Sequence, residues 1–232
     1  MQTIMNSKKL ENSSIWYYIS ENKREDAVLF IHAAFSNHTQ YDKQIDEFSK
    51  YFKVITIDLI GHGKSTVTKK GDNITITSYW IKKILDKENI KKIHIVGISL
   101  GAVIAEDFAN HYPNMMKYLS CFGAYNINNF NLKMQKSNQI AQMIMILKAL
   151  FSIKWFAKSN KLMNKYPINK RNYPLMIGCG DKDIPMEEKM VELWHNDEPN
   201  SKVVIFKNAG HLVNMDVPEK FNKVVIDFIK QN

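Results

Sequence analysis

The feature that most constrains the fold is the segment 93–105, which reads IHIVGISLGAVIA. It begins with a short run rich in β-branched residues, typical of a buried strand. Residues 100–109 are rich in Ala, Leu, Ile and Val, which favours a buried helix. Between the two lies a G-x-S-x-G, Gly97 to Gly101, whose glycines let strand and helix backbones approach at a sharp turn. The segment therefore predicts strand, tight turn and helix, with Ser99 at the apex.

Ser99 is a candidate nucleophile because of this predicted position. At a helix N-terminus, free N–H groups and the helix dipole favour the negative charge that develops during attack on a carbonyl. A serine hydroxyl reacts poorly at pH 7 unless a base removes its proton and a carboxylate orients that base. The alternative interpretation is a purely structural turn.

The rest of the chain alternates short apolar runs with helical patterns. Strands are predicted at 15–19, 27–32, 53–58, 93–96, 117–122, 175–179 and 202–206, and helices at 41–51, 75–89, 100–109, 187–195 and 216–230. This alternation predicts an α/β fold with a doubly wound, mostly parallel sheet. Active sites in such sheets lie at the carboxyl ends of the strands, and the polar and glycine-rich breaks follow strands here.

The segment 124–172 interrupts the alternation. It is rich in Asn, Lys and Met, and residues 139–156 are apolar around most of a helical circumference. We expect a short helical cap insertion at 124–172 over a core domain formed by 1–123 and 173–232. Its Met and aromatic side chains either pack on the core or line an apolar acyl pocket, and a lid that touches membranes is a third option.

The base is sought among seven histidines, because imidazole exchanges protons near neutral pH. His211 lies in a short loop between the last predicted strand and the last predicted helix, at the expected edge of the sheet. His38 and His62 also follow predicted strands and remain competitors.

The acid is sought after the second-last predicted strand, in the stretch GCGDKDIP. Either Asp181 or Asp183 could orient His211. The order Ser, Asp, His along the chain agrees with triads that accompany a G-x-S-x-G turn. The backbone N–H of Leu100 is one predicted oxyanion donor, and the second is expected from the loop after the strand that ends at His32.

Charge and cysteine content narrow the class of protein. The formal net charge is +9, but the basic residues are spread along the chain without interleaved aromatics, so we expect no nucleic-acid site. A basic rim for acidic substrates or anionic lipid stays open. Cys121 and Cys179 lie in apolar runs and are expected to be buried free thiols in a reducing compartment.

No metal or cofactor is expected, since the chain has no CxxC and no metal-ligand spacing. The N-terminal stretch lacks the apolar core of a signal peptide, and no apolar run is long enough to span a bilayer. We expect a soluble cytoplasmic protein without stable membrane insertion, and its oligomeric state stays open.

Four segments carry a resemblance to a known family. They are an H-G-x loop as His32–Ala34, a D-x-x-G-H-G-x-S loop as Asp58–Ser65, the turn Gly97–Gly101, and a G-H-x6-P-E-x-F motif as Gly210–Phe221. In this order they span nearly the whole chain. The chain resembles the α/β-hydrolase superfamily, within it the small-cap esterase-like and MenH-like branch.

The resemblance implies a catalytic triad with Ser99 as nucleophile and His211 as base. The acid of the family lies three residues after a glycine that ends a strand led by proline. Counting from Gly180 gives Asp183, which we favour, and counting from the earlier glycine gives Asp181 as second choice.

The resemblance also implies an oxyanion hole formed by the backbone N–H groups of Leu100 and Ala34. Ala33 stands where the family has the glycine of its H-G pair. Asp58 and His62 match a family loop that is mainly structural.

The predicted function is that of a serine hydrolase that cleaves a small carboxylic ester or thioester through an acyl-enzyme, without a cofactor. The partner is then a small-molecule acyl substrate. Two alternatives keep the same fold. One is a C–C hydrolase, an acyltransferase or a MenH-like lyase with the same triad, and the other is a non-catalytic ligand-binding protein on this scaffold.

Overall fold

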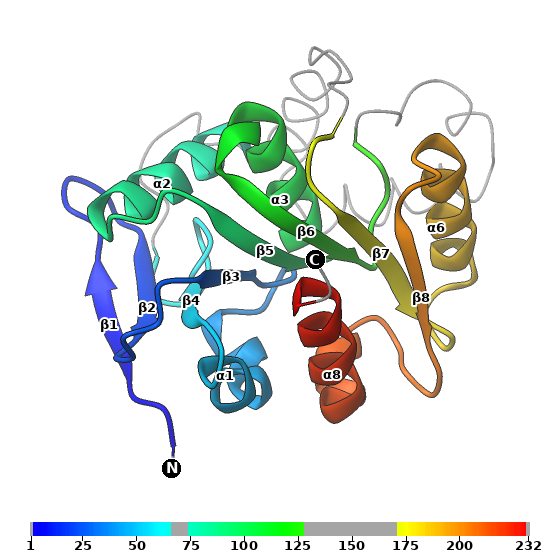
Figure 1. The fold of residues 1–232 in the computed structure, drawn as a ribbon, viewed down its shortest axis with the longest axis horizontal. Helices are drawn as coiled ribbons and strands as arrows, with labels where there is room; N and C mark the ends of the chain where they lie inside the picture. The colour runs from blue at the N-terminus through cyan, green and yellow to red at the C-terminus, as the bar shows by residue number, and fades with distance from the viewer. Residues whose placement is uncertain (1, 66–73, 128–170, 231–232) are drawn as a thin grey trace.

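The computed structural model describes residues 2–65, 74–127 and 171–230, in which eight strands form one sheet (Figure 1). The order of the strands is β1-β2-β4-β3-β5-β6-β7-β8. Their bounds are β1 Met5–Lys9, β2 Trp16–Ser20, β3 Ala27–Ile31, β4 Lys53–Ile57, β5 Ile93–Ile98, β6 Met116–Phe122, β7 Leu175–Gly180 and β8 Lys202–Phe206.

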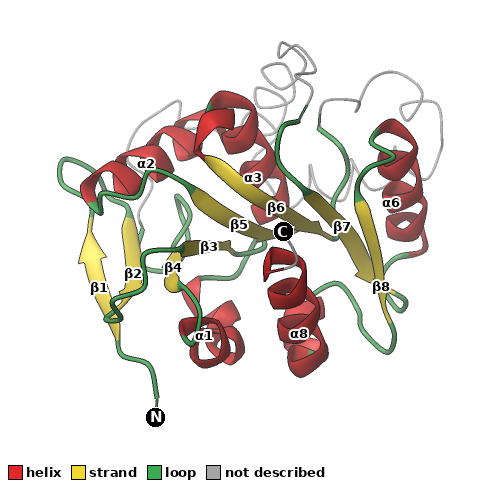
Figure 2. Ribbon diagram, viewed as in Figure 1, coloured by secondary structure: helices red, strands yellow, loops and turns green. Residues whose placement is uncertain are grey.

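Helices cover both faces of the sheet (Figure 2). Helices α1 (Asp42–Ser49) and α8 (Pro218–Lys230) pack on one face, and α2 (Ile74–Lys87), α3 (Leu100–His111) and α6 (Pro185–Asp197) on the other. Three short elements lie in the connections: the 3-10 turns η1 (His38–Tyr41) and η2 (Pro113–Met115), and the single-turn helix α7 (Val213–Asp216).

The predicted doubly wound, mostly parallel sheet is confirmed. From β4 to β8 the neighbouring strands are parallel, whereas β2 pairs antiparallel with both β1 and β4. The predicted strands and helices agree with the observed ones to within a few residues. The chain crosses from β4 over α2 to β5, so the segment around Ser99 enters the centre of the sheet.

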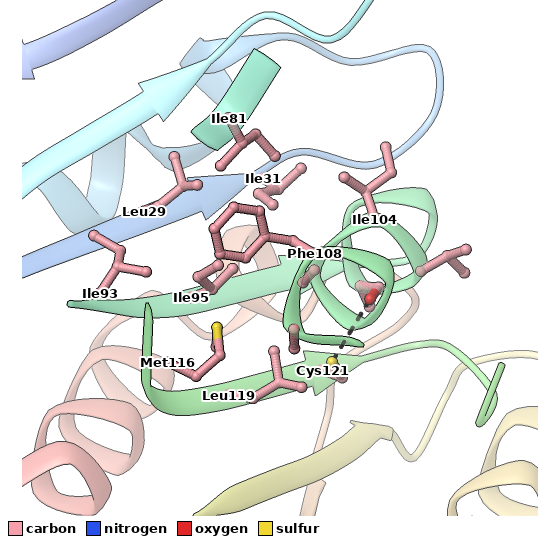
Figure 3. Packing of buried hydrophobic residues seen from close by; sticks show 14 of the residues in the cluster. Leu29, Ile31, Ile81, Ile93, Ile95, Ile104, Phe108, Met116, Leu119 and Cys121 are labelled. Atoms are coloured by element: carbon pink, nitrogen blue, oxygen red, sulfur yellow. Dashed lines mark hydrogen bonds between the residues drawn. The ribbon is translucent and has the colours of Figure 1, made fainter. Parts of the chain in front are cut away.

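The core around this central strand is apolar on both sides. Strand β5 is buried along its whole length, and Ile95 packs beside Phe108 of α3 and Leu29 of β3 (Figure 3). Burying one such side chain completely stabilises the fold by about 1.5–3 kcal/mol. The strand and the helix that flank Ser99 are therefore held by the largest cluster of buried side chains in the described protein.

The predicted cap at 124–172 falls mainly on residues outside the described part of the chain, and its helical character stays a prediction. Within the described residues, no helix combines the length and the apolarity that crossing a bilayer requires.

Candidate active site

Ser99 lies at the junction of β5 and α3, with a backbone φ of 56° and ψ of −119°. A positive φ is uncommon for a residue with a side chain, and it marks a strained turn. The N–H of Ser99 donates to the carbonyl of Phe122 at the end of β6, at 2.8 Å. The backbone is thus tied to the neighbouring strand at the predicted apex.

The two glycines of the motif are required by close backbone approach. A β carbon on Gly97 would lie 2.4 Å from the carbonyl oxygen of Gly101. A β carbon on Gly101 would lie 2.0 Å from the carbonyl oxygen of Ile31 in β3. Both distances are far below van der Waals contact, so α3 can start this close to the sheet only without side chains at these positions.

His211 and Asp183 are brought together from two different loops. Nδ1 of His211 lies 3.0 Å from each carboxylate oxygen of Asp183, whose side chain is only 2% exposed. The N–H of Ile184 donates to the same carboxylate at 2.7 Å. Since an ionised carboxylate only accepts, Nδ1 of His211 carries the proton, and its Nε2 is left to accept one.

Electrostatics at this pair favour a basic imidazole. The hydrogen bond with Asp183 raises the pKa of His211 above its ordinary value of 6.5, and it outweighs the opposing effect of burial. The charge of Asp183 and that of Glu187 act in the same direction. His211 is therefore a stronger base than a free imidazole.

Asp181, the second choice for the acid, is placed elsewhere. Its N–H donates to the carbonyl of Phe206 in β8, and its carboxylate lies 3.8 Å from Nζ of Lys207. The geometry thus pairs His211 with Asp183.

The competing histidines belong to another cluster. Nδ1 of His38 lies 2.8 Å from the buried carboxylate of Asp58, and its ring stacks on Tyr18. Asp58 also accepts from the N–H of Lys64, which closes the loop 58–65. Nδ1 of His62 lies 3.0 Å from the carbonyl oxygen of Ile60 in the same loop. These contacts attach the segment at His38 and the loop 58–65 to Asp58.

The loop after β3 is held by His32, which is fully buried. The N–H of Leu59 donates to Nε2 of His32 at 3.0 Å, so Nδ1 carries the ring proton and donates to the carbonyl of Ala33 at 2.6 Å. Burial lowers the pKa of His32 to about 4, which keeps this ring neutral. The N–H of Ser36 also donates to the carbonyl of Ala33, so residues 33–36 form a turn.

The two predicted oxyanion donors belong to the residue after Ser99 and to the loop after β3, a loop whose start approaches Gly101 through the carbonyls of Ile31 and His32. Leu100 is the first residue of α3, where N–H groups have no partner within the helix. The peptide between Ala33 and Ala34 is trans, so the Ala34 N–H points opposite to the Ala33 carbonyl that His32 holds. Within the described residues, neither amide donates to a protein acceptor.

Two residues at this site carry no strong sequence signal. Gly123, with φ of 58°, lies against the ring of His211, and its only signal is a glycine directly after a predicted strand. Glu187 in the first turn of α6 is buried, and its Oε2 has no hydrogen-bond partner within the described residues. Burial raises the pKa of Glu187 to about 7, and the charge of Asp183 adds to this effect.

The described residues contain no group of three or more His, Cys, Asp or Glu side chains that could hold a metal ion.

Comparisons with known proteins agree with this architecture. Residues 26–144 match the family described as the alpha/beta hydrolase fold. The (E)-2-((N-methylformamido)methylene)succinate hydrolase of Acinetobacter baylyi is 23% identical over 96% of this chain and 97% of that protein. A 2-hydroxy-6-oxononadienedioate/2-hydroxy-6-oxononatrienedioate hydrolase of Pseudomonas is 24% identical, covering 84% of this chain and 83% of that protein.

Solved structures share the same fold. The carboxylesterase CesB (YbfK) of Bacillus subtilis superposes with a TM-score of 0.72 at 17% identity, covering 100% of this chain and 93% of that one. The family match spans the strands β3, β4, β5 and β6, the loop after β3 and the turn at Ser99. The chain is therefore an enzyme of the α/β-hydrolase family, in the branch that holds esterases and MenH-like enzymes.

Proposed function

We propose that this enzyme is a serine hydrolase that cleaves a small carboxylic ester or thioester with Ser99, His211 and Asp183. One observation carries the proposal: Nδ1 of His211 is bonded to Asp183 at 3.0 Å, which leaves Nε2 as the proton acceptor. The proposed nucleophile is the hydroxyl of Ser99, which lies at the strained turn directly before α3. The similarity to carboxylesterases supports the ester class.

In the acylation step, Oγ of Ser99 attacks the carbonyl carbon of the substrate while Nε2 of His211 takes its proton. Asp183 holds the ring in the required tautomer and stabilises the imidazolium that forms. His211 then gives the proton to the leaving alcohol or thiol, and an acyl-enzyme remains on Ser99. Water attacks this ester with His211 again as base, which releases the acid.

The negative charge on the tetrahedral intermediate needs donors that are already in place. We assign this role to the N–H groups of Leu100 and Ala34. Leu100 adds the helix dipole of α3, which favours an anion at its N-terminus. Ala34 belongs to the loop that His32 holds.

The partner in this proposal is a small-molecule acyl substrate. We place the enzyme in the cytoplasm, because both cysteines are buried free thiols, as is common in a reducing compartment. No nucleic acid takes part in this function.

The first test is labelling with a fluorophosphonate, read as intact mass. Wild type should gain one adduct, and Ser99→Ala and His211→Ala should gain none while keeping their circular dichroism and melting temperature. Ser99→Ala should also lose hydrolysis of short p-nitrophenyl esters. Unchanged turnover in that variant would overturn the proposal.

The acid has a matched control two residues away. Asp183→Asn should lower kcat by about 10⁴-fold, because the imidazole is left in the wrong tautomer. Asp181→Asn removes the same charge from the same loop but leaves His211 untouched, and it should keep nearly full activity. The reverse ranking would transfer the role to Asp181.

A second candidate reaction uses the same triad on a carbon–carbon bond. The similarity to the hydrolase that acts on 2-hydroxy-6-oxononadienedioate favours this candidate. Turnover of such a keto acid, measured by loss of its ultraviolet absorbance in the absence of any ester turnover, would select it.

A further inference from the structure

A buried glutamine holds the loop that carries the proposed oxyanion donor Ala34. The backbone N–H of Ala33 donates to Oε1 of Gln40 at 2.9 Å, and Gln40 is only 3% exposed. Gln40 is the third of the four residues of η1, so this short helix folds back onto the loop that precedes it. The amide of a buried loop residue is thereby satisfied by a side chain rather than by water.

The orientation of the Gln40 amide is itself fixed by Asn214 in α7. Nε2 of Gln40 lies 3.4 Å from Oδ1 of Asn214, and Nδ2 of Asn214 donates to the backbone carbonyl of Gln40 at 2.7 Å. Because Nε2 faces Asn214, Oε1 is the atom turned toward Ala33. Asn214 is fully buried and lies three residues after His211.

Gln44 belongs to the same cluster but does not contact Ala33. Its side chain, also fully buried, donates to the carbonyl of Asn214 and to Asn222, and it accepts from Nδ2 of Asn214. Gln40 and Gln44 thus share residue type, burial and the partner Asn214. They differ in that Gln40, and not Gln44, accepts a hydrogen bond from the N–H of Ala33.

We propose that Gln40 is a positioning residue for hydrolysis: it fixes the peptide before Ala33, and with His32 it aims the Ala34 N–H at the reacting carbonyl oxygen. The bond from Gln40 holds one peptide plane, and the bond from His32 holds the next one. Two successive peptides held in this way leave the Ala34 N–H little freedom. This inference rests on the proposed function for its catalytic consequence.

Ala33 makes such a clamp useful. Its methyl group is buried in the cluster beneath α1 and α8, so the loop is packed through a side chain where the family has a glycine. The direction of the following N–H must then be set by hydrogen bonds. Donors of this kind act on the transition state and have little effect on ground-state binding, so a misdirected donor lowers kcat more than it changes KM.

The test compares Gln40→Met with Gln44→Met, two nearly isosteric changes that each remove one buried amide. We expect Gln40→Met to lower kcat by about 10- to 100-fold with KM nearly unchanged, up to the loss seen when an oxyanion donor is deleted. We expect Gln44→Met to lower the melting temperature comparably while its kcat stays near that of wild type.

All kcat values are divided by the concentration of sites that a fluorophosphonate labels, so a partly unfolded variant does not count as a slow one. A second readout needs no activity: hydrogen exchange of the Ala33 amide, measured by NMR. It should be slow in wild type and Gln44→Met and accelerate at least tenfold in Gln40→Met.

The outcomes separate the two proposals. Absence of labelling in folded wild type would overturn the proposed function, whatever the exchange data show. Unchanged exchange at Ala33 in Gln40→Met would overturn the role of Gln40, even in a fully active enzyme. Equal losses of kcat in Gln40→Met and Gln44→Met would also overturn it, because they would show a general structural effect.

Discussion

Gly123 lies directly against the imidazole of His211. A β carbon on Gly123 would be 3.0 Å from Cε1 and 3.1 Å from Nδ1 of that ring, and 3.6 Å from Oδ2 of Asp183. The preceding residue, Phe122, accepts the hydrogen bond from the N–H of Ser99. The end of β6 therefore touches both the proposed base and the backbone of the proposed nucleophile.

This contact predicts that Gly123→Ala lowers kcat by about 10²-fold, because an added methyl group displaces His211 by a fraction of an ångström to an ångström. The measurement is kcat with a short ester, together with the melting temperature. Gly61→Ala is the control, since Gly61 also has a positive φ, of 77°, in a loop that carries neither His211 nor Asp183. Equal losses in both variants would attribute the effect to backbone strain alone.

The sequence was sufficient for the parts of the fold that depend on local pattern. The apolar run at Ala27–Ile31 is one strand because five consecutive side chains are buried between two helical layers. The turn at Ser99 could be predicted because two glycines and a serine at fixed spacing encode one backbone geometry. The loop of His211 could be placed because it follows the last strand.

Contacts between segments that are far apart in the sequence could not be predicted from local pattern. Asp181 and Asp183 are equivalent by composition, and the family resemblance alone favours Asp183; the path of the chain after β7 brings Asp183 to His211. Gln40 is a polar residue at the start of a helical pattern, where exposure is the usual expectation. Its burial depends on Asn214, which lies 174 residues away along the chain.

The cysteines give a prediction about reactivity. Burial raises the pKa of Cys121 well above its ordinary value and that of Cys179 to about 12, and the thiol of Cys121 faces the carbonyl of Ala102 (Figure 3). Almost no thiolate exists at pH 8, so iodoacetamide should modify neither residue in the native protein. Both should react in urea, which serves as the control. Native modification, seen by mass, would contradict the observed packing.

Arg171 joins two carboxylates, that of Glu106 within α3 and that of Glu198 at the C-terminal end of α6. Nη2 of Arg171 lies 2.5 Å from Oε1 of Glu106, and Nε of Arg171 lies 2.5 Å from Oε2 of Glu198. The Arg171 side chain is 9% exposed. Glu106 also accepts from the N–H of Ile127. The residues on both sides of the segment 128–170 are therefore attached to one carboxylate of the helix that follows Ser99.

Arg171→Met should lower the free energy of unfolding by about 3–5 kcal/mol, because the buried carboxylate of Glu106 loses its cationic partner and must either take up a proton or carry its charge in the protein interior. The measurement is urea unfolding at pH 7. Adding Glu106→Gln should recover part of the loss, since the uncompensated charge is then gone. Lys189→Met breaks an exposed pair with Glu192 and should change stability by less than about 0.5 kcal/mol. A loss of similar size in Lys189→Met would contradict this account.

Glu187 gives a prediction about stability and pH. Burial, with the charge of Asp183, raises the pKa of Glu187 from 4.5 to about 7 in the folded protein. Between these two values the folded state keeps a proton that the unfolded state has released, so stability falls as the pH rises. Glu187→Gln cannot lose that proton. It should be more stable than wild type at pH 8 by roughly 1–3 kcal/mol, and nearly equal to wild type at pH 4.5.

The measurement is urea unfolding of both proteins at several pH values between 4.5 and 8, and only the difference between them is interpreted. Glu188→Gln is the matched control, because the neighbouring carboxylate is exposed on the same turn of α6. The difference in the free energy of unfolding between Glu188→Gln and wild type should not change with pH. A difference for Glu187→Gln that stays constant from pH 4.5 to 8 would show that Glu187 ionises at its ordinary pKa in the folded enzyme.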